Sequence, residues 1–391
     1  MTEHTNIWHT LIIGGGAGGL FCAGSFSAPK LLLEHNRRPG EKLSITGGGK
    51  CNFGHRSVSA GDYLCSHKHF CKNALAAFGP QAFARLLRQA QIPFDELPSG
   101  QLFARSAPEI TRFLTRRARQ QNTTLSCQTQ VLGLTREKDL FCVRTSRGNF
   151  YARQVVVAAG GLSYPALGAT GLSFQLAHAL GLAVTPLRPA LVGWSVPQPL
   201  RAVCKALAGN SCPVQISVGT HSEKGQLLFT HGGISGPAVL QSSLFWSEGE
   251  KVRINFLPQL PWAAFLAQHK NAPAPFSKLL PPHLSGKITK LLLGPLDVRA
   301  ADASKELLRR VEQTLCAWSF VPAGTAGYTR AEVTAGGVDV TQINPHTLEC
   351  KNIPGLFFIG EALDVTGRVG GYNLHWAWAS AFCAAQELAK R

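Results

Sequence analysis

The chain has 391 residues, 45% of them hydrophobic, with 39 lysines and arginines against 22 acidic residues and a formal net charge of +17. This length provides for a substantial core and two to three domains. No apolar run reaches the roughly 18 residues of a membrane span, and the start MTEHTNIWHT lacks the basic and apolar regions of a signal peptide, so we expect a soluble, cytoplasmic protein. The positive charge indicates a polyanionic partner such as nucleic acid, although a solvated basic surface without a partner has the same composition.

A strand, a glycine-rich turn, a helix and a second strand are predicted at the start of the chain. The apolar run at residues 11–13 is typical of a buried parallel strand, and the run at residues 31–33 indicates a second one. Between them, Gly14, Gly16 and Gly19 have the G-x-G-x-x-G spacing of a dinucleotide-binding unit.

Each glycine of this turn meets a separate physical need. Gly14 permits the tight turn, Gly16 lets the backbone approach a pyrophosphate, and Gly19 lets the helix pack on the strand. The amide groups and the positive dipole end of the helix then face the phosphate. Glu34, at the end of the second strand, supplies a carboxylate for a ribose diol. The unit therefore predicts dinucleotide binding; the alternative is a glycine-rich turn without a ligand.

The next distinctive stretch is SITGGGKCNF, at residues 44–53. Three successive glycines cost backbone entropy, so they mark a place where the chain approaches something closely. Lys50, Cys51 and Asn52 follow at once. The stretch therefore combines bare backbone, a cation, a thiol and an amide within one short loop.

Residues from 63 to about 121 read as a helix-rich segment, in which APEITRFLTRRARQQ carries four arginines. Short strand-like runs follow, and a further buried strand is predicted at residues 155–157. That strand ends in Ala-Ala-Gly-Gly. Small residues at a strand end let a loop return close to a bound dinucleotide.

The composition of the chain and its hydrophobic pattern change between about residues 189 and 328. Prolines become frequent, and strand-like pieces such as VQISVGT and KVRINFL precede helical stretches at about 259–318. After Glu332 a glycine-rich loop runs into a final helix that would close the first domain. We therefore predict a discontinuous cofactor-binding domain, 1–188 with 329–391, and an inserted β-rich and helical domain, 189–328.

No second G-x-G-x-x-G stands in a strand–helix frame. One dinucleotide therefore has a full Rossmann unit and a second one has none, which favours a tightly held FAD and a transient reductant, NADH or NADPH. The eleven cysteines form no C-x-x-C pair and no Cys/His cluster with zinc spacing, so we expect no metal site.

Several stretches, taken in order, resemble one family: GGGAGGL, GEKLSITGGGKCNF, VVVAAGGLSYPALGATG, LLFTHGGISGPAVLQ, AEVTAGGVD and GLFFIGEALDVTGRVGGYNLHWAWAS. Over essentially its full length the chain resembles the BaiN/YhiN-like FAD-dependent oxidoreductases. Within that family, YLCSHKHFCKNALAAF resembles the branch of ribosomal RNA dihydrouridine synthases. That branch reduces a uridine of large-subunit (23S) rRNA to 5,6-dihydrouridine with NAD(P)H through flavin, and other relatives are linked to reduction of unsaturated steroid ketones.

The resemblance implies an α/β fold, in which a glutathione-reductase-like FAD-binding Rossmann domain carries inserted β-barrel-like and helical subdomains. It implies that the glycine turn holds the ADP half of FAD and that residues 370–373 lie near the flavin ring. The cofactor-binding residues expected from the motifs are Gly14, Gly16, Ala17, Gly18, Gly19, Glu34, His35, Lys42, Thr46, Gly47, Gly48, Gly49, Val131, Ala159, Gly160, Gly161, Gly360, Glu361, Asp364, Gly370, Gly371, Tyr372 and Asn373.

Reduction of the uracil C5=C6 bond needs a hydride at C6, donors for charge that develops toward O4, and a proton at C5. In the loop at residues 47–52, Lys50 and Asn52 are candidate donors and Cys51 is the candidate acid. Cys71 is a rival acid. The alternatives are that Cys51 only packs beneath the flavin, that Cys71 is a core residue and that Lys50 is an exposed lysine without a role.

Two further functions use the same sequence features. One is reduction of small conjugated enones, which needs the flavin site but no RNA-binding face. The other is a non-catalytic, flavin-containing RNA-binding factor. The expected partners of the leading hypothesis are rRNA and NAD(P)H, with no membrane, and the sequence leaves the oligomeric state open.

Overall fold

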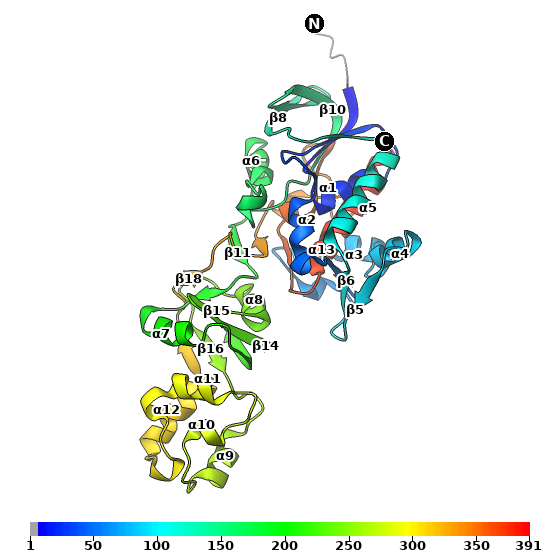
Figure 1. Cartoon of the computed structure of the whole chain (residues 1–391). Coiled ribbons are helices and arrows are strands. Elements are labelled where there is room, and N and C mark those ends of the chain that lie inside the picture. Colours follow the sequence, from blue (N-terminus) through cyan, green and yellow to red (C-terminus); the bar gives the residue numbers. More distant parts are fainter. Residues whose placement is uncertain (1–6) are drawn as a thin grey trace. The chain divides into compact units, whose positions relative to one another are not determined.

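The computed structural model describes residues 7–391 (Figure 1). It forms two compact units, one made of residues up to 189 together with 333–391 and the other of residues 190–332. The sequence placed these boundaries after residues 188 and 328. The prediction that the chain starts without a signal peptide rests partly on residues 1–6, which lie outside the described residues.

The main sheet of the first unit has seven strands. They are β1 (Ile7–Ile13), β2 (Lys30–Leu33), β7 (Thr123–Ser126), β8 (Val131–Glu137), β9 (Leu140–Thr145), β10 (Gly148–Val157) and β20 (Leu356–Phe358). Their order is β7-β2-β1-β10-β9-β8, and β20 also pairs with β10. Pairing is parallel among β7, β2, β1, β10 and β20 and antiparallel along β10-β9-β8. The apolar runs predicted as buried parallel strands are confirmed, and so is the Rossmann-type α/β class.

Helices from both parts of the chain complete the first unit. They are α1 (Ala17–Ala23), α2 (Glu41–Ile45), α3 (Lys72–Ala77), α4 (Ala82–Gln89), α5 (Ala107–Gln120), α6 (Leu172–Ala179) and α13 (Tyr372–Leu388). The final helix, α13, packs against α1, α3 and the strand β3 (Asn52–His55). Because it is surrounded by these elements, Trp376 and Trp378 are fully buried.

The segment predicted as helix-rich, residues 63–121, also contains short strands. These are β4 (Tyr63–Cys65), β5 (Phe94–Glu96) and β6 (Gln101–Ala104). β6 lies between β3 and β5 in a three-stranded sheet, and β4 pairs with β21 (Val365–Gly367). The prediction was incomplete because strands of three or four residues show no alternation, and the partner of β4 lies some 300 residues further along the chain.

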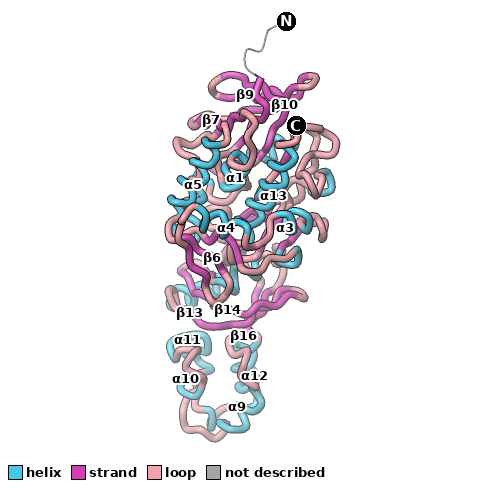
Figure 2. Tube along the Cα trace, turned by 90° about the vertical axis from the view of Figure 1, so that its right-hand side faces the viewer, coloured by secondary structure: helices cyan, strands magenta, loops and turns pink. Residues whose placement is uncertain are grey.

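The second unit combines a sheet with helices. Its elements are β12 (Trp194–Ser195), α7 (Gln198–Ala206), β13 (Ser211–Val218), β14 (His221–Thr230), β15 (Gly233–Ser235), α8 (Pro237–Ser243), β16 (Val252–Asn255), α9 (Trp262–His269), α10 (Phe276–Leu279), α11 (Gly286–Leu293), α12 (Lys305–Cys316), β17 (Trp318–Phe320) and β18 (Gly324–Thr325). The sheet order is β17-β16-β13-β14-β15-β12-β18. Figure 2 shows helices α9 to α12 gathered beyond one end of this sheet. The unit has its own hydrophobic core, around Phe229, Phe256 and Phe276.

Candidate functional site

The turn between β1 and α1 brings the three motif glycines together. Gly14 has φ +105°, and a Cβ there would lie 2.5 Å from the carbonyl oxygen of Ala158, so the turn requires glycine. A Cβ on Gly19 would overlap the carbonyl oxygen of Gly14, so the helix packs directly on the turn. A Cβ on Gly16, by contrast, would meet no atom within 4 Å. Gly16 therefore borders open space, as a backbone that approaches a pyrophosphate must.

Glu34 follows β2 with a carboxylate that is only 6% exposed. Its Oε2 accepts a hydrogen bond from the amide of Gly15 at 2.8 Å, and its Oε1 accepts one from the amide of Asn36 at 2.8 Å. His35 Nδ1 lies 3.2 Å from Oε1. A buried carboxylate needs such partners, and here they hold it beside the glycine turn. This is the place at which a ribose diol would follow the pyrophosphate.

The loop at residues 46–51 has an unusual backbone. Its glycine triplet, residues 47–49, has φ values of +58°, +66° and +86°, and Cys51 has φ +59°. A Cβ on the second or third glycine would meet no atom within 4 Å. Lys50 is exposed. The loop therefore presents bare backbone and one cation to open space.

Asn52 is used inside the protein. With its side-chain amide turned so that the nitrogen faces the two carbonyls, Asn52 donates to the carbonyls of Gly54 at 3.1 Å and Leu102 at 3.2 Å, and its oxygen accepts from the amide of Gly371 at 3.1 Å. These three bonds join β3, β6 and the residue that precedes α13. They favour a positioning role for Asn52 over direct donation to a substrate.

The two candidate acids are buried thiols. Cys51 is 0% exposed and Cys71 is 1% exposed. Burial raises the pKa of the Cys51 thiol to about 12 and that of Cys71 to about 11. Both side chains therefore keep their protons at neutral pH, which suits both a proton donor and an inert core residue.

The glycine loop before α13 is held from both sides. Gly370 and Gly371 have φ +122° and +93°. Asn373 clamps the preceding strand, because its Oδ1 accepts from the amide of Gly367 at 2.8 Å and its Nδ2 donates to the carbonyl of Gly367 at 3.0 Å. The ring of Tyr372 stacks on His55 with centroids 5.0 Å apart. The loop is thus fixed at the positive end of a 17-residue helix, where negative charge is stabilised.

Lys42 and Glu361 connect α2 to the segment after β20. Lys42 Nζ lies 2.7 Å from Glu361 Oε2, and Glu361 Oε1 accepts from the amide of Thr334 at 2.9 Å. The hydroxyl of Thr334 accepts from the amide of Leu162 at 2.8 Å. A Cβ on Gly161 would lie 2.5 Å from the Thr334 hydroxyl oxygen, so the backbone approaches this pair closely.

The remaining predicted residues also lie in the first unit, in or beside the loops that follow its strands. Gly360 donates its amide to the hydroxyl of Ser380 at 2.9 Å and accepts from Trp376 Nε1 at 3.0 Å. Asp364 Oδ2 accepts from the amide of Ser66 at 3.3 Å. The others in this group are Ala17, Gly18, Thr46, Val131, Ala159 and Gly160.

Sequence reasoning missed three residues that shape these loops: Asn36, Thr334 and Ser380. Thr334 lies in the AEVTAGGVD stretch and Asn36 two residues beyond Glu34, so their positions carried a signal. Ser380 ends the stretch GLFFIGEALDVTGRVGGYNLHWAWAS, so its position carried the same signal, although a serine inside a mostly apolar helix is not distinctive by itself.

The arrangement fits an adenine dinucleotide. The loops after β1, β2, β10 and β20 meet at the carboxyl edge of a parallel sheet, the usual ligand position in such folds. Open backbone at Gly16 suits a pyrophosphate, and the carboxylate of Glu34 suits a ribose. Within residues 7–391, no cluster of His, Cys, Asp or Glu side chains could hold a metal ion. In the same part of the chain, the helices are too short or too polar to cross a membrane.

The model of the family described as "HI0933-like protein Rossmann domain" matches residues 8–387. The chain is 39% identical over 389 residues to a protein of Escherichia coli named ribosomal RNA dihydrouridine synthase, with 97% of each chain covered. It is 30% identical over 409 residues to a protein of Clostridium scindens named 3-dehydro-bile acid delta(4,6)-reductase, covering 97% of this chain and 98% of that one.

Among solved structures, the FrdA subunit of E. coli quinol fumarate reductase superposes with a TM-score of 0.51 and 14% identity. The match covers 98% of this chain and 70% of FrdA. This likeness concerns the fold.

Proposed function

Because this chain belongs to the HI0933-like Rossmann-domain family and is an FAD-dependent oxidoreductase, we propose that it reduces a uridine of 23S rRNA to 5,6-dihydrouridine with NADH or NADPH. The observation that carries the proposal is the glycine-lined dinucleotide site in a chain 39% identical to a protein named ribosomal RNA dihydrouridine synthase. The net charge of +17 supports an RNA partner, since phosphate contacts supply much of the affinity for nucleic acid. We place the protein in the cytoplasm, with its substrate.

In this proposal the first unit binds FAD along the carboxyl edge of its parallel sheet. Gly16 and the start of α1 hold the pyrophosphate, Glu34 binds the ribose of the adenosine, and residues 370–373 border the flavin ring. Lys42 and Glu361 lie along the stretch between them. Bound FAD, once reduced by NADH or NADPH, would supply the hydride for C6 of the uracil.

The protein must then stabilise charge toward O4 and protonate C5. The exposed ammonium of Lys50 and the positive end of α13 are the candidates for the first task. For the second, we propose Cys51, with Cys71 as the rival. The target base must leave its stack to reach such a site, at a cost of a few kcal/mol.

Matched serine variants show which of the two thiols donates the proton. If Cys51 is the proton donor, Cys51→Ser should bind FAD and accept hydride from NADPH normally, yet its RNA-dependent flavin reoxidation should slow by about 10²-fold or more. If Cys51 only packs, as its complete burial also allows, serine should leave that rate near wild type. A collapse in Cys71→Ser alone would move the role to that residue. Stopped-flow absorbance of the flavin measures the rate of RNA-dependent reoxidation in the wild type and in both variants.

The overall function is tested by mass spectrometry. Purified protein, NADPH and an unmodified 23S rRNA transcript should yield a uridine heavier by two hydrogens, and rRNA from a deletion strain should lack that modification. No mass increase in the transcript together with unchanged rRNA in the deletion strain would overturn the proposal.

The relative named as a bile acid reductase supports a second candidate, reduction of small conjugated enones. The two activities differ in what oxidises the reduced flavin. Rapid NADPH consumption with a steroid enone and without RNA would favour the second candidate. Tight RNA binding without any flavin reoxidation would instead favour the non-catalytic factor.

A further inference from the structure

Three arginines form one face of α5. Arg112, Arg116 and Arg119 stand at positions i, i+4 and i+7 of the helix and are all exposed. Such spacing puts them in a single stripe that is about 10 Å long. The opposite side of the helix is buried through Ile110 and Leu114. We call the three arginines the α5 basic face.

The charge of this face is not used within the protein. Among residues 7–391, no carboxylate lies within 4.0 Å of these three guanidinium groups. Arg117, on another side of the helix, is different: it donates to the carbonyl of Gly24 at 3.1 Å and lies over the ring of Phe113. Within the described part of the chain, the three arginines of the stripe are therefore exposed and unpaired, whereas Arg117 has a structural role.

The start of α5 adjoins the loop with the glycine triplet. The amide of Ala104, two residues before the N-cap Ser106, donates to the carbonyl of Cys51 at 3.1 Å. Lys50 and Arg105, the neighbours of these two residues, are both exposed. Exposed cations thus begin at the glycine loop and continue along α5.

Contacts with the turn before α2 widen the basic surface. Thr111 lies against Gly40, because a Cβ on that glycine would be 2.6 Å from Thr111 Cγ2. Arg37 and Arg38, in the turn that leads to Gly40, are exposed. The nearby carboxylates are few: Glu41 and Glu109 are part-exposed, and Asp95 lies 3.6 Å from Arg105.

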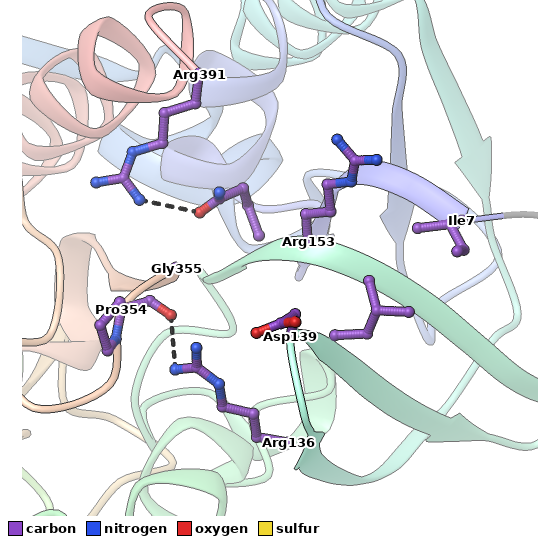
Figure 3. Close-up of a pocket in the computed structure, with 9 residues that line it drawn as sticks. Ile7, Arg136, Asp139, Arg153, Pro354, Gly355 and Arg391 are labelled. Carbon is purple, nitrogen blue, oxygen red and sulfur yellow. Dashed lines mark hydrogen bonds between the residues drawn. The ribbon is translucent and has the colours of Figure 1, made fainter.

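A second group of arginines lies elsewhere on the first unit, around a cavity of about 470 Å³ (Figure 3). Two of these arginines bind groups of the protein itself. Arg391 pairs with Glu349 at 2.7 Å, and Arg136 donates to the carbonyl of Pro354 at 2.9 Å. Ile7, at the start of β1, also lines this cavity, so it lies at the other end of that strand from the glycine turn. This cavity is therefore a weaker candidate than the α5 basic face for binding an RNA partner.

We propose that the α5 basic face binds the phosphate backbone of the RNA substrate and leads that strand to the glycine loop. The proposal rests on the proposed function. Arginine forms forked, charge-assisted bonds with phosphate, and the stripe spans more than one phosphate of a single strand. Its position next to the glycine loop joins backbone binding to the place where the base would meet the flavin.

The test compares two triple variants with the wild type, all as FAD-loaded protein. One replaces the α5 basic face with glutamine: Arg112→Gln, Arg116→Gln and Arg119→Gln. The charge-matched control replaces three exposed cations on the β8 to β10 strands and their turns: Lys138→Gln, Arg144→Gln and Arg153→Gln. Binding of a fluorescein-labelled 20-nucleotide oligouridylate is followed by anisotropy at several KCl concentrations.

We expect the α5 variant to bind the oligonucleotide at least tenfold more weakly at about 0.15 M KCl. The slope of log K against log salt should become shallower by about 2, since each lost phosphate contact removes about 0.7 for a single strand. The control should keep both values. An unchanged slope in the α5 variant, or an equal loss in the control, would overturn the proposal.

Uridine reduction in a 23S rRNA transcript, measured on the same preparations, separates this proposal from the proposed function. If the wild type reduces uridine and the α5 variant binds and reduces equally well, only the role of the face is wrong. If the wild type neither binds the oligonucleotide nor reduces the transcript, the RNA function and the role of the face fall together. NADPH reduction of the flavin should be the same in all three proteins.

Discussion

Gly16 and Gly19 lie three residues apart but are required for different reasons. Gly16 has ordinary extended φ and ψ of −77° and −166°, and its missing side chain leaves space that no protein atom occupies. We expect Gly16→Ala to fold normally, because alanine adopts this backbone without strain. Its affinity for FAD should fall at least about tenfold, since the methyl group would occupy the space in which we propose that the pyrophosphate binds. FAD content after purification and titration of the apoprotein measure the effect.

Gly19→Ala is the matched comparison. Its methyl group would overlap the carbonyl oxygen of Gly14, so this variant should lose thermal stability even without FAD. If Gly16→Ala retains wild-type affinity for FAD, the assignment of the turn to the pyrophosphate is wrong.

Burial of His375 makes the stability of the first unit depend on pH. The ring is 0% exposed, and burial lowers its pKa to about 4. The unfolded chain therefore binds this proton below about pH 6.5 while the folded chain stays neutral down to about pH 4. Stability should fall as the pH drops through this window, by about 2 kcal/mol at pH 5 for this group alone.

His375→Leu should remove that component. Urea unfolding at pH 7.5 and pH 5, followed by tryptophan fluorescence, should show a smaller loss in the variant than in the wild type. His283→Leu, at an exposed position, is the control and should behave like the wild type. Equal losses in wild type and His375→Leu would contradict the argument.

At the scale of elements, Asn52 ties the start of α13 to β3 and β6. Asn52→Ala removes three hydrogen bonds to backbone groups, each with a net contribution of about 1 kcal/mol. We expect a loss of about 2–4 kcal/mol in the unfolding free energy and a changed visible circular dichroism of the flavin, because residues 370–373 lose their support. Denaturant unfolding and the flavin spectrum check the two effects. A variant with normal stability that is defective only in RNA-dependent reoxidation would instead make Asn52 a catalytic donor.

The long, patterned elements could be predicted from the sequence. Buried strands such as β1 and the glycine turn combine an apolar run with a fixed spacing, and α13 is a long and mostly apolar segment. Residues 52–55, 63–65 and 101–104 could not be predicted as strands, because their pairing depends on distant partners. The same limit applies to the site: the motif glycines and Glu34 carry a spacing signal, whereas the internal bonds of Asn52 and the burial of Cys51 arise only from tertiary packing.

At the scale of the whole molecule, the two units have separate hydrophobic cores. In our proposal the residues that bind FAD all belong to the first unit, so binding should stabilise chiefly that unit. Scanning calorimetry of the apoprotein should show two transitions, and FAD at 100 times its Kd should raise one of them, by about 2.7 kcal/mol in unfolding free energy. A single transition that shifts as a whole would contradict independent unfolding of the units.

The first unit is built from both ends of the chain, so its folding during synthesis on the ribosome must wait for the C-terminal part. β20 pairs with β10, and α13 packs against α1, so the nascent cofactor-binding unit stays unfinished until the last residues emerge. Translation of residues 190–332 delays that completion by roughly 7 to 29 s at about 5–20 residues per second. During this interval the apolar edge of β10 and the face of α1 lack their final cover. The emerging chain therefore exposes apolar surface for that period, and such surface makes a partly folded chain prone to aggregation.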